Sequence, residues 1–505
     1  MRVRISNFGP RTSASADRNL RSEVCGLAVV LLVLSGCAVG PRYAKPATPT
    51  APEYKEVPPN WKTAQPNDQI ARGKWWEIFQ DPQLNALEEQ INVSNQNLKA
   101  AQAQYEQARA LVRFNRAAYY PTVTAGASAL REHVSQNRPL IRSTGQISTN
   151  ASDFQIPVDA SYEPDVFGRV RRTVEAARSN AQGSAADLES VNLSLHADLA
   201  IDYFQLRTLD AEAQLLNSTV TAFEKALDLT RNRYQGGVAS AVDVAQAETQ
   251  LETTRAQAID VQVQRSQNEH AIAVLSGQPP STFSIPASPW TTAPPVIPPG
   301  LPSDLLERRP DIAGAERRVA SANAQIGVAR AAYFPAITLT GSGGFESTAI
   351  TTLIQGPSGF LTSGASAVVT AFDVGRRRAI SEQARAAYNQ ATANYRQSVL
   401  TAFQEVEDNL AALRILEQES KTQNAAVAAS EHSLELSTNR YKGGVVSYLE
   451  VITAQSIALS DERAAVGILR RRMTASVSLI KALGGGWNVT SLPSAKVASQ
   501  SANGQ

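Results

Sequence analysis

Residues that commonly build metal and catalytic sites are scarce in this chain. Its 505 residues include two cysteines and four histidines. Only His432 has a possible ligand one helical turn away, Glu435, and such a pair is more typical of a solvated helix face. The chain has no P-loop, nucleophile elbow or dinucleotide-binding fingerprint. We therefore predict no catalytic residue, no metal site and no cofactor, with an enzyme of unrecognised type as a remote alternative. His133, His196 and His270 are predicted to be surface or packing residues.

Both cysteines lie near the N-terminus, which excludes an internal disulfide once a leader is removed. Residues 1–23 hold five arginines, an apolar run covers 24–34, and small residues precede Cys37. This order is typical of a secretory signal, and the run is shorter than the roughly 20 residues of a spanning helix. The sequence Leu34-Ser35-Gly36-Cys37 resembles a bacterial lipobox. Residues 1–36 are thus predicted to be a signal peptide, and Cys37 to carry a covalent lipid. Ala38 after it favours the outer membrane over the inner one.

Long hydrophobic segments and an excess of one charge are also absent after the leader. No later segment approaches 18 consecutive apolar residues, so no spanning helix is predicted. The formal net charge is +2, and the leader accounts for five basic and two acidic residues. A near-neutral mature chain gives no indication of a nucleic-acid partner.

Three sequence landmarks occur twice, in the same order and about 210 residues apart. Ala-Ala-Tyr-Tyr-Pro at 117–121 recurs as Ala-Ala-Tyr-Phe-Pro at 331–335. Asp-Val-Phe-Gly-Arg at 165–169 recurs as Asp-Val-Gly-Arg at 373–376, and Asn-Arg-Tyr-Gln-Gly-Gly-Val at 232–238 as Asn-Arg-Tyr-Lys-Gly-Gly-Val at 439–445. The duplication predicts two structural halves with one architecture.

Two proline-rich stretches, at 41–66 and 277–303, divide the chain. The predicted organisation is an N-terminal arm, a first repeat, a linker, a second repeat and a C-terminal tail. These units cover 37–80, 81–276, 277–303, 304–483 and 484–505.

Each repeat is predicted to contain one very long helix. Residues 376–442 contain no glycine or proline, and 169–235 contain only Gly183. Helices over 168–235 and 376–442 would each reach about 100 Å. Shorter helices are predicted at 240–276 and 446–482, and another before each aromatic-proline landmark. The narrow apolar stripes on the long helices fit a wall one helix thick.

Two strands per repeat are predicted between the aromatic-proline landmark and the long helix. Residues 153–162 and 336–345 alternate apolar and polar side chains, and weaker candidates lie at 122–131 and 361–372. The strands therefore fall near 121–163 and 335–372. Segments of this length and period are typical of outer-membrane barrel strands. Four strands cannot close a barrel, and open edges cannot face lipid, so the strands must be shared among chains.

Several longer motifs resemble one known family. These are Cys-Ala-Val-Gly-Pro-Arg-Tyr at 37–43, Trp-Trp at 75–76 with Phe-Gln-Asp-Pro-Gln-Leu at 79–84, and Leu-Glu-Arg-Arg-Pro-Asp-Ile at 306–312. The last continues through Ala-Gln-Ile-Gly-Val-Ala-Arg at 324–330. Together they resemble the outer-membrane factors of tripartite efflux systems, of the TolC/OprM type and the NodT-like lipoprotein branch.

The resemblance implies a mainly α fold with membrane β-strands, assembled as a homotrimer. Each protomer would give four strands to a twelve-stranded outer-membrane barrel and its helices to a periplasmic α-barrel. A small mixed equatorial domain around the rod would come from 41–80, 277–303 and the tail, which is either equatorial or disordered. The implied partners are a periplasmic adaptor, an inner-membrane pump of the resistance-nodulation-division class and outer-membrane lipid.

The turns after the two long helices are the candidate working parts. Glycine readily ends a helix and serine can cap the next one, so these turns have a purely structural explanation. The resemblance adds a role as the periplasmic aperture and adaptor-docking surface. The predicted tip residues are Gly236, Gly237, Ser240, Gly443, Gly444 and Ser447.

The resemblance also implies a gate beside these turns. Tyr441 and Asp243 match a tyrosine and an aspartate that lock TolC-like channels, and Leu449 is a candidate apolar constriction. Glu450 matches an acidic position at the inner mouth, although a solvated acid at a helix start explains it equally well. Val446 and Thr453 stand where relatives have an arginine and an aspartate.

Arginines begin both long helices, at Arg169, Arg171 and Arg172 and again over 376–378. Basic residues there oppose the helix dipole, so we predict either contact with lipid phosphates or a solvated turn. The function predicted overall is a passive exit duct that opens by movement of the helix tips. A type I secretion or metal-efflux channel and a pore-less structural lipoprotein remain as alternatives.

Overall fold

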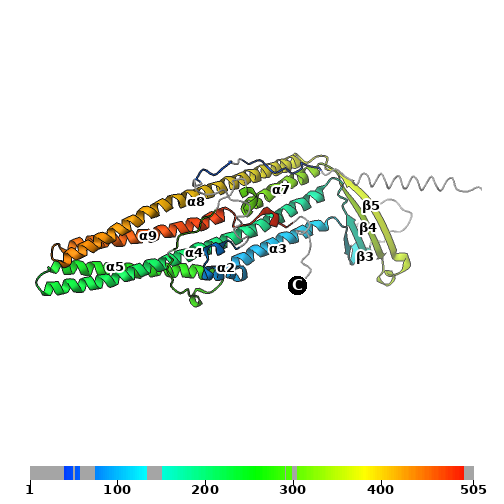
Figure 1. Ribbon diagram of the computed structural model, residues 1–505. Coiled ribbons are helices and arrows are strands. Elements are labelled where there is room, and N and C mark those ends of the chain that lie inside the picture. Colours follow the sequence, from blue (N-terminus) through cyan, green and yellow to red (C-terminus); the bar gives the residue numbers. More distant parts are fainter. Residues whose placement is uncertain are drawn as a thin grey trace, which may run out of the picture.

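The computed structural model describes residues 39–48, 52–56, 74–133, 150–290, 292–297 and 304–493. Its main elements are a bundle of long helices and one antiparallel sheet at the end of that bundle (Figure 1). The predicted signal peptide, Cys37 and residues 494–505 lie outside the described residues. Within them, no helix combines the length and apolar character needed to cross a membrane.

The helices lie where the repeat pattern predicts them. The two longest, α4 and α8, each contain 67 residues, and each is followed by a 35-residue helix. The helical elements are η1 (Trp75–Phe79), α2 (Pro82–Ser94), α3 (Gln96–Ala117), α4 (Arg169–Gln235), α5 (Ala241–Leu275), η2 (Pro280–Thr282), α6 (Leu305–Arg308), α7 (Pro310–Ala331), η4 (Ile350–Thr352), η5 (Gly356–Ser358), α8 (Arg376–Lys442), α9 (Tyr448–Ala482) and η6 (Val489–Ser491).

The sheet joins the two repeats through β3 and β4. Its strands are β1 (Thr122–Ala125), β2 (Ser128–His133), β3 (Asn150–Tyr162), β4 (Ala336–Ser347) and β5 (Gly359–Val368). β1 and β2 both pair with β3, β3 pairs with β4, and β4 pairs with β5, all antiparallel. Large apolar side chains on the sheet are exposed, including Val123, Leu130, Leu361 and Val368. The outer edges of the sheet, β1 with β2 and β5, have no strand beside them among the described residues.

Two strand predictions need correction. The strand predicted at 122–131 is broken into β1 and β2, with Gly126 and Ala127 between them. The break lies opposite Pro157 of β3, which has no amide hydrogen to give to the ladder. The strand predicted to reach 372 ends at Val368, where the pairing with Ala336 at the start of β4 also ends.

The helices extend from one side of the sheet as two hairpins (Figure 1). α4 with α5 and α8 with α9 reach the end of the molecule farthest from the sheet, whereas α3 and α7 lie nearer to it. Gly183, the one glycine in α4, faces α7: a Cβ built on it would lie 3.5 Å from the Gly314 carbonyl. Small residues therefore allow α4 and α7 to pack closely in a thin wall.

A larger core lies midway along the rod. η1 contributes Trp75, Trp76 and Phe79, which pack with Tyr203 and Phe204 of α4. The Tyr203 hydroxyl donates to the Asp81 carboxylate at 2.6 Å. Nearer the C-terminal end of α4, the buried Asp210 accepts hydrogen bonds from Arg207 at 3.2 Å and from Arg265 at 2.7 Å. Segments before α2 and after α5 thus thicken the middle of the rod.

The N-terminal arm lies against the helices close to the sheet. The Val39 amide donates to the Phe167 carbonyl at 3.2 Å, and Asn323 of α7 donates to the Pro41 carbonyl at 3.2 Å. Gly40 has a φ of +119°, and a Cβ on it would lie 2.6 Å from the Gly327 Cα, so only glycine fits. The arm therefore contacts both repeats.

A buried acid–base pair fastens α2 to α4. Glu88 Oε2 lies 2.6 Å from His196 Nδ1, and His196 Nε2 lies 3.3 Å from Asn92 Oδ1. The His196 ring stacks on Trp76 with centroids 4.4 Å apart. Burial raises the pKa of Glu88 well above 4.5 and lowers the pKa of His196 to about 4. The pair is therefore neutral, with its proton on the carboxyl group.

This pair predicts a stability maximum on the acidic side of neutrality. The folded pair holds one proton, whereas the unfolded chain, with pKa values of 4.5 for Glu88 and 6.5 for His196, holds two below pH 4.5, one between these values and none above pH 6.5. The unfolding free energy contributed by the pair therefore falls as the pH rises above 6.5 and as it drops below 4.5. The loss on the alkaline side is at most about 1.4 kcal/mol per pH unit.

A Glu88→Gln variant should not show this alkaline loss, because its folded state holds no proton at this pair above pH 6.5, so unfolding releases none. Thermal unfolding of both proteins at pH 6.5 and pH 8 measures the effect as a difference in midpoint shift. Equal shifts in the two proteins would contradict a neutral pair.

Candidate functional site at the helical turns

The first turn, between α4 and α5, has the geometry that ends one helix and begins another. Gly237 has a φ of +75°, and the Val238 amide donates to the Arg233 carbonyl at 2.9 Å. This is a Schellman motif closed by a left-handed glycine. The Ser240 hydroxyl then accepts from the Asp243 amide at 3.2 Å, and the Asp243 carboxylate accepts from the Ser240 amide at 2.9 Å. That reciprocal capping box fixes the start of α5.

The second turn, between α8 and α9, repeats the helix end but not the cap. Gly444 has a φ of +76°, and the Val445 amide donates to the Arg440 carbonyl at 3.0 Å. Ser447 occupies the N-cap position of α9, but its side chain makes no capping hydrogen bond. Glu450, which stands where Asp243 stands in the first turn, reaches Arg440 at 3.4 Å instead. The predicted cap is thus formed in the first repeat only.

Of the four tip glycines, two require glycine by conformation. Gly236 and Gly443 have φ values of −79° and −75°, which any residue can adopt. Gly237 and Gly444 have positive φ values and need glycine.

An apolar cluster behind the turns holds the two hairpins together. Phe223 and Leu227 of α4 and Leu251 of α5 pack with Tyr441, Tyr448 and Val451 from the second hairpin. The rings of Tyr441 and Tyr448 lie 5.2 Å apart. Beyond this cluster, the side chains of Val238, Val242, Val445 and Leu449 are between 56% and 70% exposed. The tip therefore presents an apolar surface on a packed base.

Arg233 bonds the first hairpin to the second, and its contacts with Tyr441 and Lys442 form the Arg233 clasp. Its Nη1 donates to the carbonyls of Tyr441 at 2.9 Å and Lys442 at 3.2 Å, and its guanidinium carbon lies 4.6 Å from the Tyr441 ring centroid. It thus adds a second hydrogen bond to the Tyr441 carbonyl, which also accepts from the Gly444 amide at 3.0 Å, and it gives the Lys442 carbonyl at the end of α8 a partner. It also makes a cation–π contact. No pattern local to the sequence distinguishes Arg233 from other helix-end arginines. The repeated Asn-Arg-Tyr landmark contained it, but its repeat partner Arg440 turns to Glu450 instead.

The predicted hydrogen bond between Tyr441 and Asp243 is not formed within the protomer. The Tyr441 hydroxyl donates to Thr230 Oγ1 at 3.4 Å, and its side chain is only 4% exposed. Asp243 is occupied by the backbone and hydroxyl of Ser240. The ring of Tyr441 is held inward beneath Arg233, so its hydroxyl faces α4 rather than α5.

The remaining gate candidates lie on the exposed start of α9. Leu449 is exposed, and the Thr453 hydroxyl donates to the Leu449 carbonyl at 2.9 Å. Glu450 is half exposed and paired with Arg440. The apolar constriction and the acidic mouth remain predictions. Among the described residues, no cluster of three or more histidine, cysteine, aspartate or glutamate side chains could hold a metal ion.

At the sheet end, acidic residues explain the arginines that begin the long helices. Asp165 accepts from the Val170 and Arg171 amides at 2.9 and 2.8 Å and pairs with the Arg171 guanidinium at 3.1 Å. Asp373 accepts from the Arg377 amide at 3.2 Å and its guanidinium at 2.7 Å. The carboxylates thus fill the open amides of the helix start and offset the basic charge. Further pairs join Arg169 to Glu163, Arg172 to Glu175 and Arg378 to Glu382.

Most of these elements lie within the residues that match one protein-family model. A model described as outer membrane efflux protein matches residues 87–278 and 301–485, which include both hairpins and the strands. The chain belongs to this family. It is similar to the probable efflux pump outer membrane protein TtgC of Pseudomonas putida, with 33% identity over 469 residues, 93% of this chain and 96% of that protein. Outer membrane protein OprJ of Pseudomonas aeruginosa is 33% identical over 474 residues, 93% of this chain and 97% of that protein.

A solved structure supports the same assignment. The CmeC outer membrane channel of Campylobacter jejuni matches with a TM-score of 0.84 and 26% identity, over 90% of this chain and 96% of that chain. The resemblance inferred from the sequence is therefore confirmed. The protein is an outer-membrane efflux channel component, of a family of transport proteins rather than enzymes.

An Arg233→Met variant should loosen the tip. The change keeps an apolar side chain of similar length but removes two charge-assisted hydrogen bonds, each worth roughly 1.5–3 kcal/mol when well formed. Because Arg233 is half-buried, we expect a smaller net loss, seen as about tenfold faster amide hydrogen exchange over 434–455. Arg440→Met is the matched control, since Arg440 makes only an exposed pair with Glu450. Equal exchange in the two variants would exclude the clasp.

Proposed function

We propose that the protein is the exit duct of a tripartite efflux pump and works as a homotrimer. The observation that carries this proposal is the sheet: four antiparallel strands, counting the broken β1 and β2 as one, with exposed apolar side chains. In the described part of the chain, no strand pairs with its outer edges. Lipid supplies no hydrogen bonds to open strand edges, and the smallest barrels have about eight strands. Three copies would close twelve strands around a pore in contact with outer-membrane lipid.

The same symmetry would place the helical hairpins in a hollow rod through the periplasm. At 1.5 Å per residue, α4 and α8 each extend about 100 Å, and the core around η1 and α2 would form the equatorial belt. We infer that the apolar tips meet a periplasmic adaptor and that an inner-membrane pump of the resistance-nodulation-division class supplies the energy. The duct itself would be passive, without cofactor, and would open by movement of the tips.

The names of the relatives favour small-molecule efflux over the other channel functions. Two relatives of Pseudomonas putida, each 33% identical over 469 residues, are named an antibiotic efflux pump outer membrane protein and a toluene efflux pump outer membrane protein. A type I secretion or metal-efflux channel would share the architecture, whereas a pore-less structural lipoprotein would not need the sheet edges to close.

Single-channel recording in planar bilayers tests the duct. We expect the trimer to conduct weakly when its tips are closed, and the Arg233→Met variant to conduct at least severalfold more because its hairpins are released. A trimer that shows no conductance in either form would favour the structural lipoprotein.

Labelling with palmitate tests the proposed lipid on Cys37. Wild-type protein should incorporate the label, and a Cys37→Ser variant should not, because only the thiol can form the linkage at this position. The variant should still fractionate with the outer membrane if the sheet is inserted. Label retained in the Cys37→Ser variant would place the acyl chain elsewhere.

A further inference from the structure

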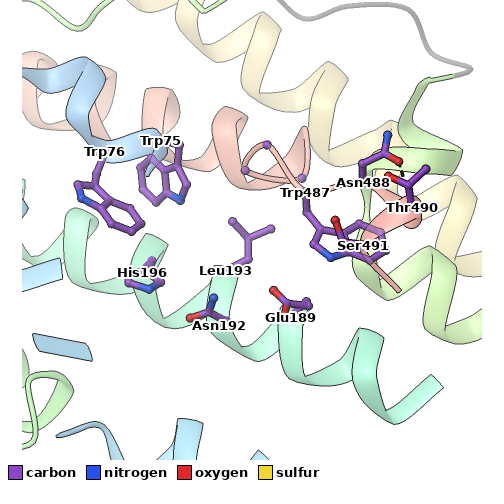
Figure 2. Close-up of a pocket in the computed structure, with 13 residues that line it drawn as sticks. Trp75, Trp76, Glu189, Asn192, Leu193, His196, Trp487, Asn488, Thr490 and Ser491 are labelled. Atoms are coloured by element: carbon purple, nitrogen blue, oxygen red, sulfur yellow. Dashed lines mark hydrogen bonds between the residues drawn. The ribbon is translucent and has the colours of Figure 1, made fainter. Parts of the chain in front are cut away.

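A cavity of about 350 Å³ lies beside α4 in the middle of the rod. Figure 2 shows that its walls come from α4, from η1 and from the segment that follows α9. α4 provides Glu189, Asn192, Leu193 and His196. Three of the chain's five tryptophans, Trp75, Trp76 and Trp487, also line it. This volume is within the range of small-molecule sites, about 300–1,000 Å³.

The wall after α9 depends on three consecutive glycines. Gly484, Gly485 and Gly486 have φ values of +90°, +57° and +83°. A Cβ on Gly485 would lie 2.3 Å from Leu193 Cδ1, and one on Gly484 would lie 2.1 Å from the Arg308 carbonyl oxygen. The chain can therefore make this close turn only with glycine, and the turn leads directly into Trp487.

Several polar groups of the cavity have no partner within the described part of the chain. The indole N–H groups of Trp76 and Trp487 and the Asn192 Oδ1 are buried without a hydrogen bond. Glu189 makes neither a hydrogen bond nor an ion pair there, and burial alone raises its pKa. Unpaired polar groups in a buried place cost free energy, so their grouping around one cavity points to a ligand.

The described residues that line the cavity also include no charged basic group. His196 is the one basic residue among the lining side chains, and burial keeps it neutral by lowering its pKa to about 4. Its Nδ1 is engaged by Glu88 and its ring by Trp76. Among the described residues that line the cavity, the Glu189 carboxylate is thus the one acidic group, and no cation there offsets it.

We propose that this cavity binds a small organic cation, an ammonium group that carries apolar substituents. Glu189 would offset the positive charge, and the indole rings of Trp75 and Trp487 would contact the apolar and cationic surface, since indole is the aromatic side chain that attracts cations most strongly. Asn192 Oδ1 would accept a hydrogen bond from an N–H of the ligand. A neutral or anionic molecule of the same size would leave the carboxylate without a partner.

This site is separate from the proposed duct mouth. Glu189 lies 46 residues before the end of α4, or roughly 70 Å along the helix. Its occupation does not require the tips to open, so binding and conduction can be measured independently in the same preparation.

Equilibrium dialysis of the full-length protein in detergent tests the site, with benzylammonium, which carries N–H groups, as the probe. We expect saturable binding of one cation per chain and no comparable binding of benzenesulfonate. Glu189→Gln should weaken the affinity at least tenfold. Glu106→Gln, which removes an exposed acid on α3, is the matched control and should leave the affinity unchanged. Trp487→Leu should also weaken binding, and size-exclusion chromatography would show that each variant keeps the wild-type assembly.

Three results would overturn the proposal. These are equal affinity in the wild-type and Glu189→Gln proteins, equal binding of benzenesulfonate, and no saturable binding by the wild type. If a basic side chain of a neighbouring copy filled the cavity, the wild type would bind no probe and Glu189→Gln would weaken the assembly instead. Each of the three results can be separated from failure of the duct, because the assembly and its conductance would be unaffected. Weakened assembly of Glu189→Gln would lower conductance as well, and it would likewise overturn the proposed cation site.

Discussion

The unpaired edges of the small sheet determine that this chain needs neighbouring chains in a membrane. A strand edge exposes backbone amides and carbonyls, and a hydrocarbon environment gives them no partner. Among the described residues, β1 with β2 and β5 are such edges. β1 and β5 contain no charged residue of the kind that protects soluble edges, whereas β2 adds the exposed Arg131 and Glu132 to its apolar Leu130. A single chain therefore leaves its own backbone unsatisfied in the outer membrane, where its family resides. The thin helical wall is also incomplete in a single chain, because most residues of α8 are exposed or only partly buried along its length.

The backbone of the fold follows from local sequence, but the contacts between distant segments do not. Uninterrupted helix formers predicted α4 and α8 to within a residue, and alternation predicted β3 and β4. The break between β1 and β2 was missed because it depends on Pro157 in another strand. The Glu88–His196 pair and the Arg233 clasp were missed because they join residues far apart in sequence. The predicted Tyr441–Asp243 bond is not formed within the protomer, because Ser240, three residues from Asp243, supplies a nearer partner. Between protomers the bond stays a prediction.

The two repeats share a backbone but have diverged in their side chains. At the turns, Asp243 caps its own helix, whereas Glu450 at the equivalent place pairs across the turn with Arg440. Arg233 reaches the other hairpin, whereas Arg440 remains within its own. The first hairpin therefore has the better fixed turn and also supplies the clasp to the second. A duct built from such units would have two kinds of hairpin alternating around its mouth, with unequal resistance to movement.

The docked N-terminal arm has a consequence for how the protein sits in its membrane. Only Ala38 separates Cys37 from Val39, whose amide is already bonded to the Phe167 carbonyl at the base of the sheet. Two residues of extended chain span about 7 Å. An acyl group on Cys37 would consequently be a short tether, not a flexible one, and would fix the depth at which the strands enter the membrane. In a trimer, three such contacts around the barrel would also resist its tilting.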